Sequence, residues 1–345
     1  MKNKPIYVTQ PSLAPLEEYV EILEGVWERG ILTHNGPLVQ KLEKEICSRV
    51  GINNFVAVSN GTIALQMAIK ALELKGEIIT TPFTWIATIS AIKWEDCTPV
   101  FCDIDPKTLN IDPNEIENHI TDKTVAIMPV HVFGNPCDVD AIDKIAQKYN
   151  LKVIYDAAHA IGSTYKEKGI LEYGNISATS LHATKLLNTA EGGGCVTTDD
   201  ELDKKLKRIR FFGHNDEKDI VEDGFNGKMT EVHAGLGLAN LKYYEKVLSD
   251  RKYKYNLYIE GLNTIEDLSF KDEVSLSAVN SINWVRLLPQ IVYYFYSALK
   301  VGAPDTEVAF SVPTGNFGNI LAGWMAKKIG LPISNLICGS NQNDI

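Results

Sequence analysis

Short β-branched runs alternate with helical patterns through the middle of this 345-residue chain. Runs typical of buried strands occupy residues 55–58, 78–81, 99–103, 125–131, 153–156 and 195–198. Helical patterns occupy residues 61–74, 85–94, 138–149 and 200–211. Because parallel strands need crossover connections, this alternation predicts an α/β domain with a mostly parallel sheet. Ligands of such sheets bind beyond the carboxyl ends of the strands, so residues that follow each run are candidates for a site.

Flanking patterns extend the domain in both directions. Helices are expected at residues 15–25 and 37–50, on either side of a loop at 30–37. A single long helix is expected at 230–249, with small residues on one face that would permit close packing, including packing against another subunit. We therefore expect one domain over residues 1–262.

Charge and cysteine content exclude several classes of protein. The 44 acidic side chains outnumber the 34 basic ones, and the net charge of −10 argues against a nucleic-acid partner. No apolar run has the length of a membrane span, and no apolar leader is visible. The six cysteines are scattered without C-x-x-C spacing, so neither a metal site nor a disulfide framework is expected. The cytoplasm fits these features best.

Two segments after predicted strands carry candidate catalytic groups. In LKVIYDAAHA, residues 151–160, an apolar run ends in Asp156, and His159 follows three residues later. Taken alone, Asp156 could cap a helix and His159 could be a buried core residue. In TSLHATKLLNTAEGGG, residues 179–194, Lys185 precedes three glycines. A single lysine is usually a solvated surface charge, so neither segment is specific by itself.

Two further segments add possible contacts for a flat, phosphate-bearing ligand. The strand at 55–58 runs into Asn60, Gly61 and Thr62, where a helix begins. Free amides at a helix N-terminus bind phosphate, although many α/β loops look similar. Trp85 follows another strand, and it could be either a core aromatic residue or a stacking partner.

Together these residues meet the needs of pyridoxal 5′-phosphate (PLP). This cofactor requires a lysine for a Schiff base, an acid beside its pyridine nitrogen, a phosphate cup and a flat partner for its ring. Lys185 and Asp156 could supply the first two. The Gly61 and Thr62 amides with the hydroxyl of Ser180 could form the cup, and the indole of Trp85 could cover the ring.

The motifs also resemble a known family in their order along the chain. The matching segments are GILTHNGPLVQKLEKEI, SNGTIALQMAI, TTPFTWIAT, PVHVFGNPCDVDAI, YDAAHAIGSTY, SLHATKLLNTAEGGG and GFNGKMTEVHAGLGLANL. The chain thereby resembles the DegT/DnrJ/StrS family of sugar-nucleotide aminotransferases. This resemblance implies the aspartate-aminotransferase-type PLP fold, fold type I, over residues 1–262.

The resemblance also implies roles for individual residues. Lys185 would hold the cofactor, Asp156 would pair with the pyridine nitrogen, and His159 would lie near the phenolic oxygen. Asn226, in GFNGKM, would reach the cofactor phosphate of a neighbouring subunit, which implies a homodimer. Lys228 stands where many members carry arginine, which would weaken or loosen an anion contact there.

The implied reaction moves an amino group from L-glutamate to a keto-deoxysugar nucleotide. The HATK…EGG segment looks most like members that aminate the 4-keto position in the biosynthesis of surface polysaccharides. The resemblance implies no metal ion in this reaction.

The last part of the chain departs from this pattern. The family continues as a small C-terminal domain, which we expect to be missing here. Residues 263–345 instead resemble threonine synthase, whose TGNFGN turn, at 314–319 in this chain, cradles phosphate. We expect an incomplete α/β fragment that does not fold independently. Two alternatives follow: a chimeric PLP-binding protein without turnover, and a threonine-synthase-like lyase.

Overall fold

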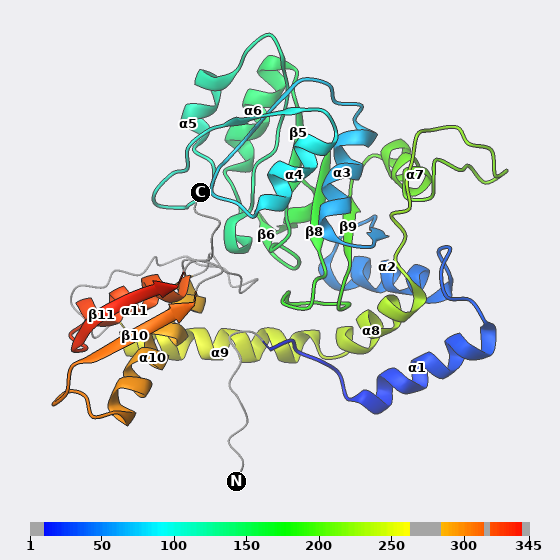
Figure 1. The fold of residues 1–345 in the computed structure, drawn as a ribbon. Coiled ribbons are helices and arrows are strands. Elements are labelled where there is room, and N and C mark those ends of the chain that lie inside the picture. The colour runs from blue at the N-terminus through cyan, green and yellow to red at the C-terminus, as the bar shows by residue number, and fades with distance from the viewer. Residues whose placement is uncertain (1–9, 263–283, 314–317, 340–345) are drawn as a thin grey trace. The chain divides into compact units, whose positions relative to one another are not determined.

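The computed structural model describes residues 10–262, 284–313 and 318–339 (Figure 1). The chain divides into two compact units. The larger unit lies within residues 11–278, and the smaller one comprises residues 279–345 with the first ten residues. Each unit is described separately.

A seven-stranded sheet forms the centre of the larger unit. Its order is β1–β9–β8–β5–β4–β2–β3, and every neighbouring pair is parallel except those that involve β9. This confirms the predicted α/β fold with a mostly parallel sheet. The strand bounds are β1 Val56–Val58, β2 Glu77–Thr80, β3 Thr98–Phe101, β4 Thr124–Ile127, β5 Lys152–Asp156, β8 Ile176–Ser180 and β9 Gly193–Val196.

Local signals explain where the helices begin and end. The Asn60 side chain accepts a hydrogen bond from Ile63 N at 2.9 Å and so caps α3. Gly51 ends α2 in the left-handed conformation that glycine tolerates. The helices of this unit are α1 Leu16–Arg29, α2 Pro37–Val50, α3 Gly61–Ala71, α4 Ile86–Trp94, α5 Pro113–Ile116, α6 Val139–Tyr149, α7 Asp200–Ile209, α8 Glu231–Leu241 and α9 Tyr244–Leu262.

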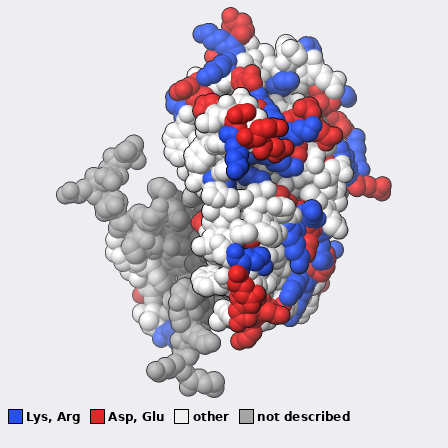
Figure 2. Space-filling view, turned by 90° about the vertical axis from the view of Figure 1, so that its right-hand side faces the viewer, with Lys and Arg blue, Asp and Glu red and all other residues white. Residues whose placement is uncertain are grey.

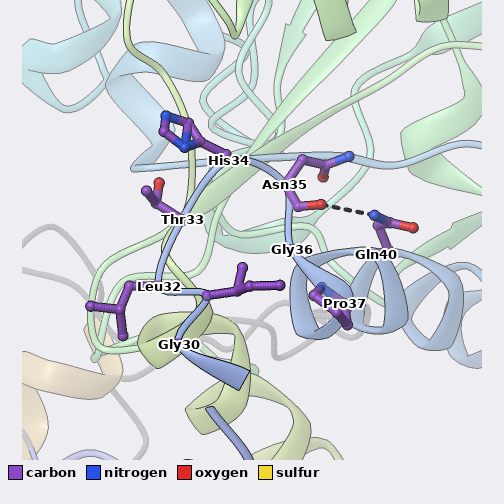
Figure 3. A pocket seen from close by; sticks show the side chains of 9 residues that line it. Gly30, Leu32, Thr33, His34, Asn35, Gly36, Pro37 and Gln40 are labelled. Atoms are coloured by element: carbon purple, nitrogen blue, oxygen red, sulfur yellow. Dashed lines mark hydrogen bonds between the residues drawn. The ribbon is translucent and has the colours of Figure 1, made fainter. Parts of the chain in front are cut away.

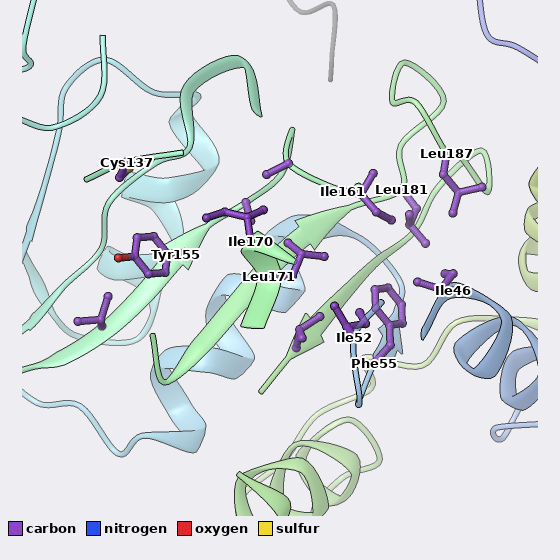
Figure 4. Close-up of a cluster of buried hydrophobic side chains, with 14 of the residues drawn as sticks. Ile46, Ile52, Phe55, Cys137, Tyr155, Ile161, Ile170, Leu171, Leu181 and Leu187 are labelled. Atoms are coloured by element: carbon purple, nitrogen blue, oxygen red, sulfur yellow. The ribbon is translucent and has the colours of Figure 1, made fainter. Parts of the chain in front are cut away.

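Both faces of the sheet are buried under helices. On β5, Val153 and Tyr155 belong to one apolar cluster, while Ile154 belongs to another. The first cluster includes residues of α2, α6 and α8, and Figure 4 shows its members Ile46 and Phe55. The second includes residues of α3, α4 and α7. The larger unit is thus a three-layer α/β/α arrangement, with α3 and α4 side by side on one face (Figure 1).

One strand was missed and one expected helix was wrong. Strand β8 was not predicted. The helix expected at 230–249 is two helices, α8 and α9, separated at Lys242 and Tyr243. The small-residue face of α8 packs within the chain: a Cβ built on Gly235 would lie 3.0 Å from Ile22 Cγ2, in α1. The expected close packing of this face is therefore confirmed within the chain, where Gly235 lies against α1.

The smaller unit contains two helices and two strands within its described residues. They are α10 Trp284–Lys300, β10 Val308–Pro313, α11 Gly318–Lys328 and β11 Ile333–Gly339. Strands β10 and β11 are parallel, and the rings of Tyr294 and Phe310 meet edge to face with centroids 4.7 Å apart. Residues 314–317 of the TGNFGN turn lie outside the described residues. That this segment does not fold independently remains a prediction.

Candidate active site

The sheet brings three predicted site segments to one edge. Asp156 is the last residue of β5, Ser180 is the last residue of β8, and these two strands are parallel neighbours. Gly61 begins α3, and a Cβ built on it would lie only 3.0 Å from Ser180 Cβ. The candidate phosphate cup thus combines residues that are more than a hundred positions apart in sequence, and it lies along the same edge as Asp156.

Asp156 is a buried carboxylate with defined hydrogen bonds. Its side chain accepts a bond from Thr88 Oγ1 at 2.6 Å and another from Ala158 N at 3.1 Å. Burial raises the pKa of Asp156, while the two hydrogen bonds and the nearby Lys185 act in the opposite direction. No helix begins at Ala158, so the bond to its amide closes a turn rather than capping a helix.

Lys185 lies in the hairpin that joins β8 to β9. Burial lowers the pKa of Lys185 to about 8, and the Asp156 carboxylate limits the fall. The Lys185 side chain is half-buried, unlike that of a fully solvated surface lysine. An amine with this pKa releases its proton close to neutral pH, so it is suited to act as a nucleophile and as a base.

Contacts from distant parts of the chain hold this hairpin. Asn188 Nδ2 donates to Ser12 O at 3.0 Å, and Asn240 Nδ2 donates to Asn188 O at 2.9 Å. Arg251, in α9, places Nη2 3.4 Å from the backbone oxygen of Lys185. The N-terminal segment and both α8 and α9 therefore position the loop that carries the lysine.

His159 and Trp85 differ in their exposure. Burial, aided by the charge of Lys185, lowers the pKa of His159 to about 3, so its ring is neutral at physiological pH. Trp85 precedes α4, and 58% of its surface is exposed. Trp85 is therefore not a core residue, and its ring is available to a ligand.

The three glycines after Lys185 have separate packing roles. A Cβ on Gly193 would lie 2.6 Å from Asn60 C and 2.7 Å from Gly61 N, both in the backbone. Gly192 meets the Thr189 side chain, and Gly194 meets the ring of Phe55. Gly193 thus allows β9 to pack directly against the turn that begins α3.

Asn226 is exposed and contacts a different set of residues. Its Oδ1 accepts a hydrogen bond from Lys228 Nζ at 2.6 Å. The same ammonium lies 4.6 Å from the Phe211 ring centroid and 4.7 Å from that of Phe212. These rings hold Lys228 in place, so its charge points along the same surface as Asn226.

The loop between α1 and α2 lines a hollow of about 640 Å³ (Figure 3). The Asn35 carbonyl accepts a bond from Gln40 Nε2 at 2.8 Å, which Figure 3 shows as a dashed line. The buried Glu231 carboxylate accepts bonds from Leu38 N at 3.0 Å and Val39 N at 2.9 Å. Glu231 therefore fixes the first turn of α2 to α8. The hollow is lined by residues of this loop and of the first turn of α2, not by Lys185.

Sequence reasoning missed several supporting residues. Thr88 bonds Asp156, while Asn188, Asn240 and Arg251 support the lysine hairpin. Thr88 had one available signal, because a hydroxyl in the first turn of an apolar helix needs a buried partner. The other three lie far from the recognised motifs.

Comparisons with known proteins agree with this arrangement. The sequence profile of the DegT/DnrJ/EryC1/StrS aminotransferase family matches residues 16–291. The dTDP-4-amino-4,6-dideoxy-D-glucose transaminase of Shigella dysenteriae is 49% identical over 267 residues, which are 77% of this chain and 73% of that protein. The GDP-perosamine synthase of Escherichia coli O157:H7 is 36% identical over 271 residues, 77% of this chain and 73% of that one.

Solved structures show the same fold. DesI, crystallised in the presence of its TDP-sugar product, has a TM-score of 0.75 and 32% identity, covering 80% of this chain and 71% of its own. The sugar aminotransferase CalS13 from Micromonospora echinospora has a TM-score of 0.74 and 26% identity, covering 84% of each chain. Fold and site therefore define a PLP-dependent aminotransferase of fold type I. The chain belongs to the DegT/DnrJ/EryC1/StrS aminotransferase family, and PLP is its cofactor.

Proposed function

We propose that this protein transfers an amino group from L-glutamate to the 4-keto position of a keto-deoxysugar nucleotide. The observation that carries the proposal is the half-buried amine of Lys185, whose pKa is lowered to about 8 and whose charge interacts with the buried Asp156 carboxylate. The names of the similar transaminases support a nucleotide-sugar acceptor, since two of them include 4-amino-4,6-dideoxyglucose attached to dTDP. A role in making surface polysaccharides fits a further relative, the spore coat polysaccharide biosynthesis protein SpsC of Bacillus subtilis.

The site residues fit PLP in chemistry and in space. Gly61 leaves room beside Ser180 where a side chain would crowd the cup, and α3 begins there with amides that the helix itself does not use. Asp156 provides a buried negative charge, and Trp85 provides an exposed ring. When bound, the cofactor carries the amino group between substrates and withdraws electrons from the carbon that loses its proton.

The proposed roles follow from these positions. The Lys185 amine would hold the cofactor, and it would accept a proton from the substrate carbon as a base and return it as an acid. Asp156 holds a proton on the pyridine nitrogen by electrostatic attraction. Neutral His159 would lie near the phenolic oxygen without adding a competing charge. Gly61, Thr62 and Ser180 bind the phosphate, and Trp85 covers the ring.

A homodimer completes this proposal. Leu16, Val20 and Trp27 lie on α1 with 68%, 42% and 69% of their surfaces exposed, which is an unusual arrangement of large apolar side chains. A second copy of the chain could bury them. Asn226 is exposed together with Lys228, as a residue that reaches a neighbour's phosphate must be.

We propose a cellular compartment for the protein from its thiols and its charge. Cys47, Cys97, Cys102, Cys137 and Cys195 are free thiols, which favours the reducing cytoplasm. Within the described ranges, no helix is long and apolar enough to cross a membrane. Figure 2 shows basic and acidic side chains intermixed on the face in view.

We further propose that residues 263–345 are a threonine-synthase-like fragment without activity of its own. The supporting features are the TGNFGN motif and the parallel pair β10 and β11, which α11 connects. The second candidate function is therefore a chimeric protein that binds PLP but does not turn over substrate. Incubation with O-phosphohomoserine should release no phosphate, and release would support the lyase alternative instead.

One experiment separates these functions. The protein, the Lys185→Ala variant and the control Lys93→Ala, which removes an exposed lysine, are incubated with PLP and then with glutamate and a dTDP-4-keto-6-deoxysugar. We expect visible cofactor absorbance and an amino-sugar product with the protein and the control, and neither with Lys185→Ala. Absorbance without product would favour the chimera. Absorbance that persists in Lys185→Ala would contradict the proposed lysine.

A further inference from the structure

Two threonine hydroxyls form a chain that ends on the buried carboxylate of the site. Thr84 Oγ1 and Thr88 Oγ1 are 2.7 Å apart, and Thr88 Oγ1 lies 2.6 Å from Asp156 Oδ2. Thr88 is fully buried in α4, whereas Thr84 is partly exposed in the preceding loop. The chain of hydroxyls therefore runs from the edge of the site to Asp156.

The number of available protons fixes the direction of these bonds. An ionised carboxylate only accepts, so the single hydroxyl proton of Thr88 must go to Asp156. Thr88 then has only lone pairs to offer Thr84, so Thr84 is the donor in the outer bond. The arrangement is consistent only while Asp156 is charged. A protonated Asp156 that donated to Thr88 would reverse both bonds.

The same segment carries the exposed ring of the site. Trp85 follows Thr84 directly, and Thr88 N donates to Trp85 O at 3.1 Å in the first turn of α4. The hydroxyl chain thus connects the loop that presents Trp85 with the carboxylate at the end of β5. The two groups that would meet the face and the nitrogen of the cofactor ring share one hydrogen-bonded support.

We propose that Thr88 is a positioning residue, which acts through Asp156 and, assisted by Thr84, keeps this carboxylate charged and directed toward the pyridine nitrogen. This inference rests on the proposed role of Asp156 at the cofactor. The other recorded hydrogen bond to the Asp156 side chain comes from Ala158 N, which holds the opposite oxygen, Oδ1. Loss of the Thr88 hydroxyl would leave Oδ2 without its buried donor.

The chain offers a matched set of substitutions. Thr88→Val removes the hydroxyl and keeps the shape, while Thr88→Ser keeps the hydroxyl and removes a methyl group. Thr80→Val is the control, because Thr80 is equally buried and donates to a backbone oxygen, Met128 O, at 2.8 Å. The readouts are the dissociation constant of PLP, measured by equilibrium dialysis of the full-length apoprotein, and the melting temperature.

A lost bond to a charged group predicts that Thr88→Val weakens PLP binding by about tenfold to a hundredfold. We expect Thr88→Ser to bind within about threefold of the wild type, and Thr80→Val to lower the melting temperature without weakening binding. Unchanged binding by Thr88→Val would overturn the inference. Equal weakening by Thr88→Ser or by Thr80→Val would also overturn it, because packing alone would then explain the effect.

An Asp156→Asn variant separates this inference from the function on which it rests. If Asp156→Asn loses PLP and Thr88→Val does not, the role of Thr88 is wrong and the proposed site stands. If Asp156→Asn binds PLP as well as the wild type, the proposed pyridine partner is wrong, and the inference falls with it.

Discussion

Substitution of Gly193 by alanine tests how β9 and the start of α3 depend on each other. The residue begins β9, between β1 and β8, and it pairs with Val58 of β1 and with Ser180 of β8. An added Cβ would come within 2.7 Å of Gly61 N, within 2.6 Å of Asn60 C and within 2.7 Å of Thr179 O. All three atoms belong to the backbone, so no flexible side chain can move aside.

The size of the destabilisation follows from how far these distances lie below ordinary van der Waals contact. Ordinary contact begins near 3.4 Å, so the turn must retreat by about 0.8 Å at Asn60 C and about 0.7 Å at Gly61 N, the differences between 3.4 Å and the distances of 2.6 and 2.7 Å. Overpacking of this kind costs about 1 to 3 kcal/mol, and backbone on both sides places Gly193→Ala at the upper end. In a unit of this size, that corresponds to a fall of roughly 5 to 10 °C in melting temperature. The same retreat would stretch an amide–phosphate hydrogen bond and weaken PLP binding about tenfold or more.

Thermal unfolding with and without PLP, together with equilibrium dialysis, would measure both effects. Gly25→Ala is the control, because Gly25 lies inside α1 and its Cβ would meet only the mobile end of Arg29. We expect this control to be stabilised by about 0.5 to 1 kcal/mol, as alanine is in a helix interior. The reasoning would be refuted if Gly193→Ala melted within 1 °C of the wild type and bound PLP equally well.

Three other predictions concern charged or titrating groups. Glu231→Gln should lower the free energy of unfolding by about 1 to 2 kcal/mol in urea titrations, because a neutral amide binds the N-terminus of α2 less well; no loss would contradict the role of its charge. Covalent loading of PLP, followed by stopped-flow absorbance, should accelerate about tenfold per pH unit up to about 8 and then level off, since only neutral Lys185 reacts; a flat profile would be inconsistent with its lowered pKa. Burial lowers the pKa of His131 from 6.5 to about 3. Between these pH values the unfolded chain binds a proton that the folded chain excludes, so the free energy of unfolding decreases as the pH is lowered. The contribution of His131 is about 2 kcal/mol at pH 5 relative to neutral pH. A His131→Gln variant should lose this part of the pH dependence in urea unfolding at the two pH values, while His159 keeps its own.

Much of the sheet could be predicted because its strands are continuously apolar. Strand β8 escaped prediction for the opposite reason. Its sequence, ISATS, contains three hydroxyl side chains, yet every residue of the strand is buried. Ser177 Oγ donates to Tyr173 O at 3.2 Å, and Thr179 Oγ1 donates to Ala157 O at 3.0 Å. Because backbone acceptors satisfy these hydroxyls, hydropathy gives no indication that the strand is internal.

The break between α8 and α9 has a tertiary cause that the local sequence does not contain. No proline or glycine lies at Lys242 and Tyr243. A turn forms there, with Tyr243 N donating to Asn240 O at 3.0 Å, and both side chains bind Glu18 of α1. The 3.6-residue pattern predicts one helix because a contact with residue 18, more than 220 positions away, cannot be read from the pattern.

Some residues of the candidate site could also be predicted from the sequence, and others could not. Residues within recognisable motifs, such as Lys185 and Asp156, could be named from the sequence, because each follows a strand and carries a group that PLP requires. Residues that act through them could not. Arg251 and Asn240 contact the lysine hairpin only because α8 and α9 return to it, and neither residue belongs to a pattern near the lysine.

The position of β9 also determines when the protein can acquire its cofactor during synthesis. Strand β1 pairs with β9, and β9 alone connects it to the rest of the sheet. A ribosome must therefore add more than 130 residues after β1 before that strand has a partner. Until then β1, which leads into the turn at Gly61, has no partner strand, and loop closure over this separation is slow. A nascent chain that ends before residue 193 should have no PLP site, whereas capture of the cofactor could drive the final closure of the sheet.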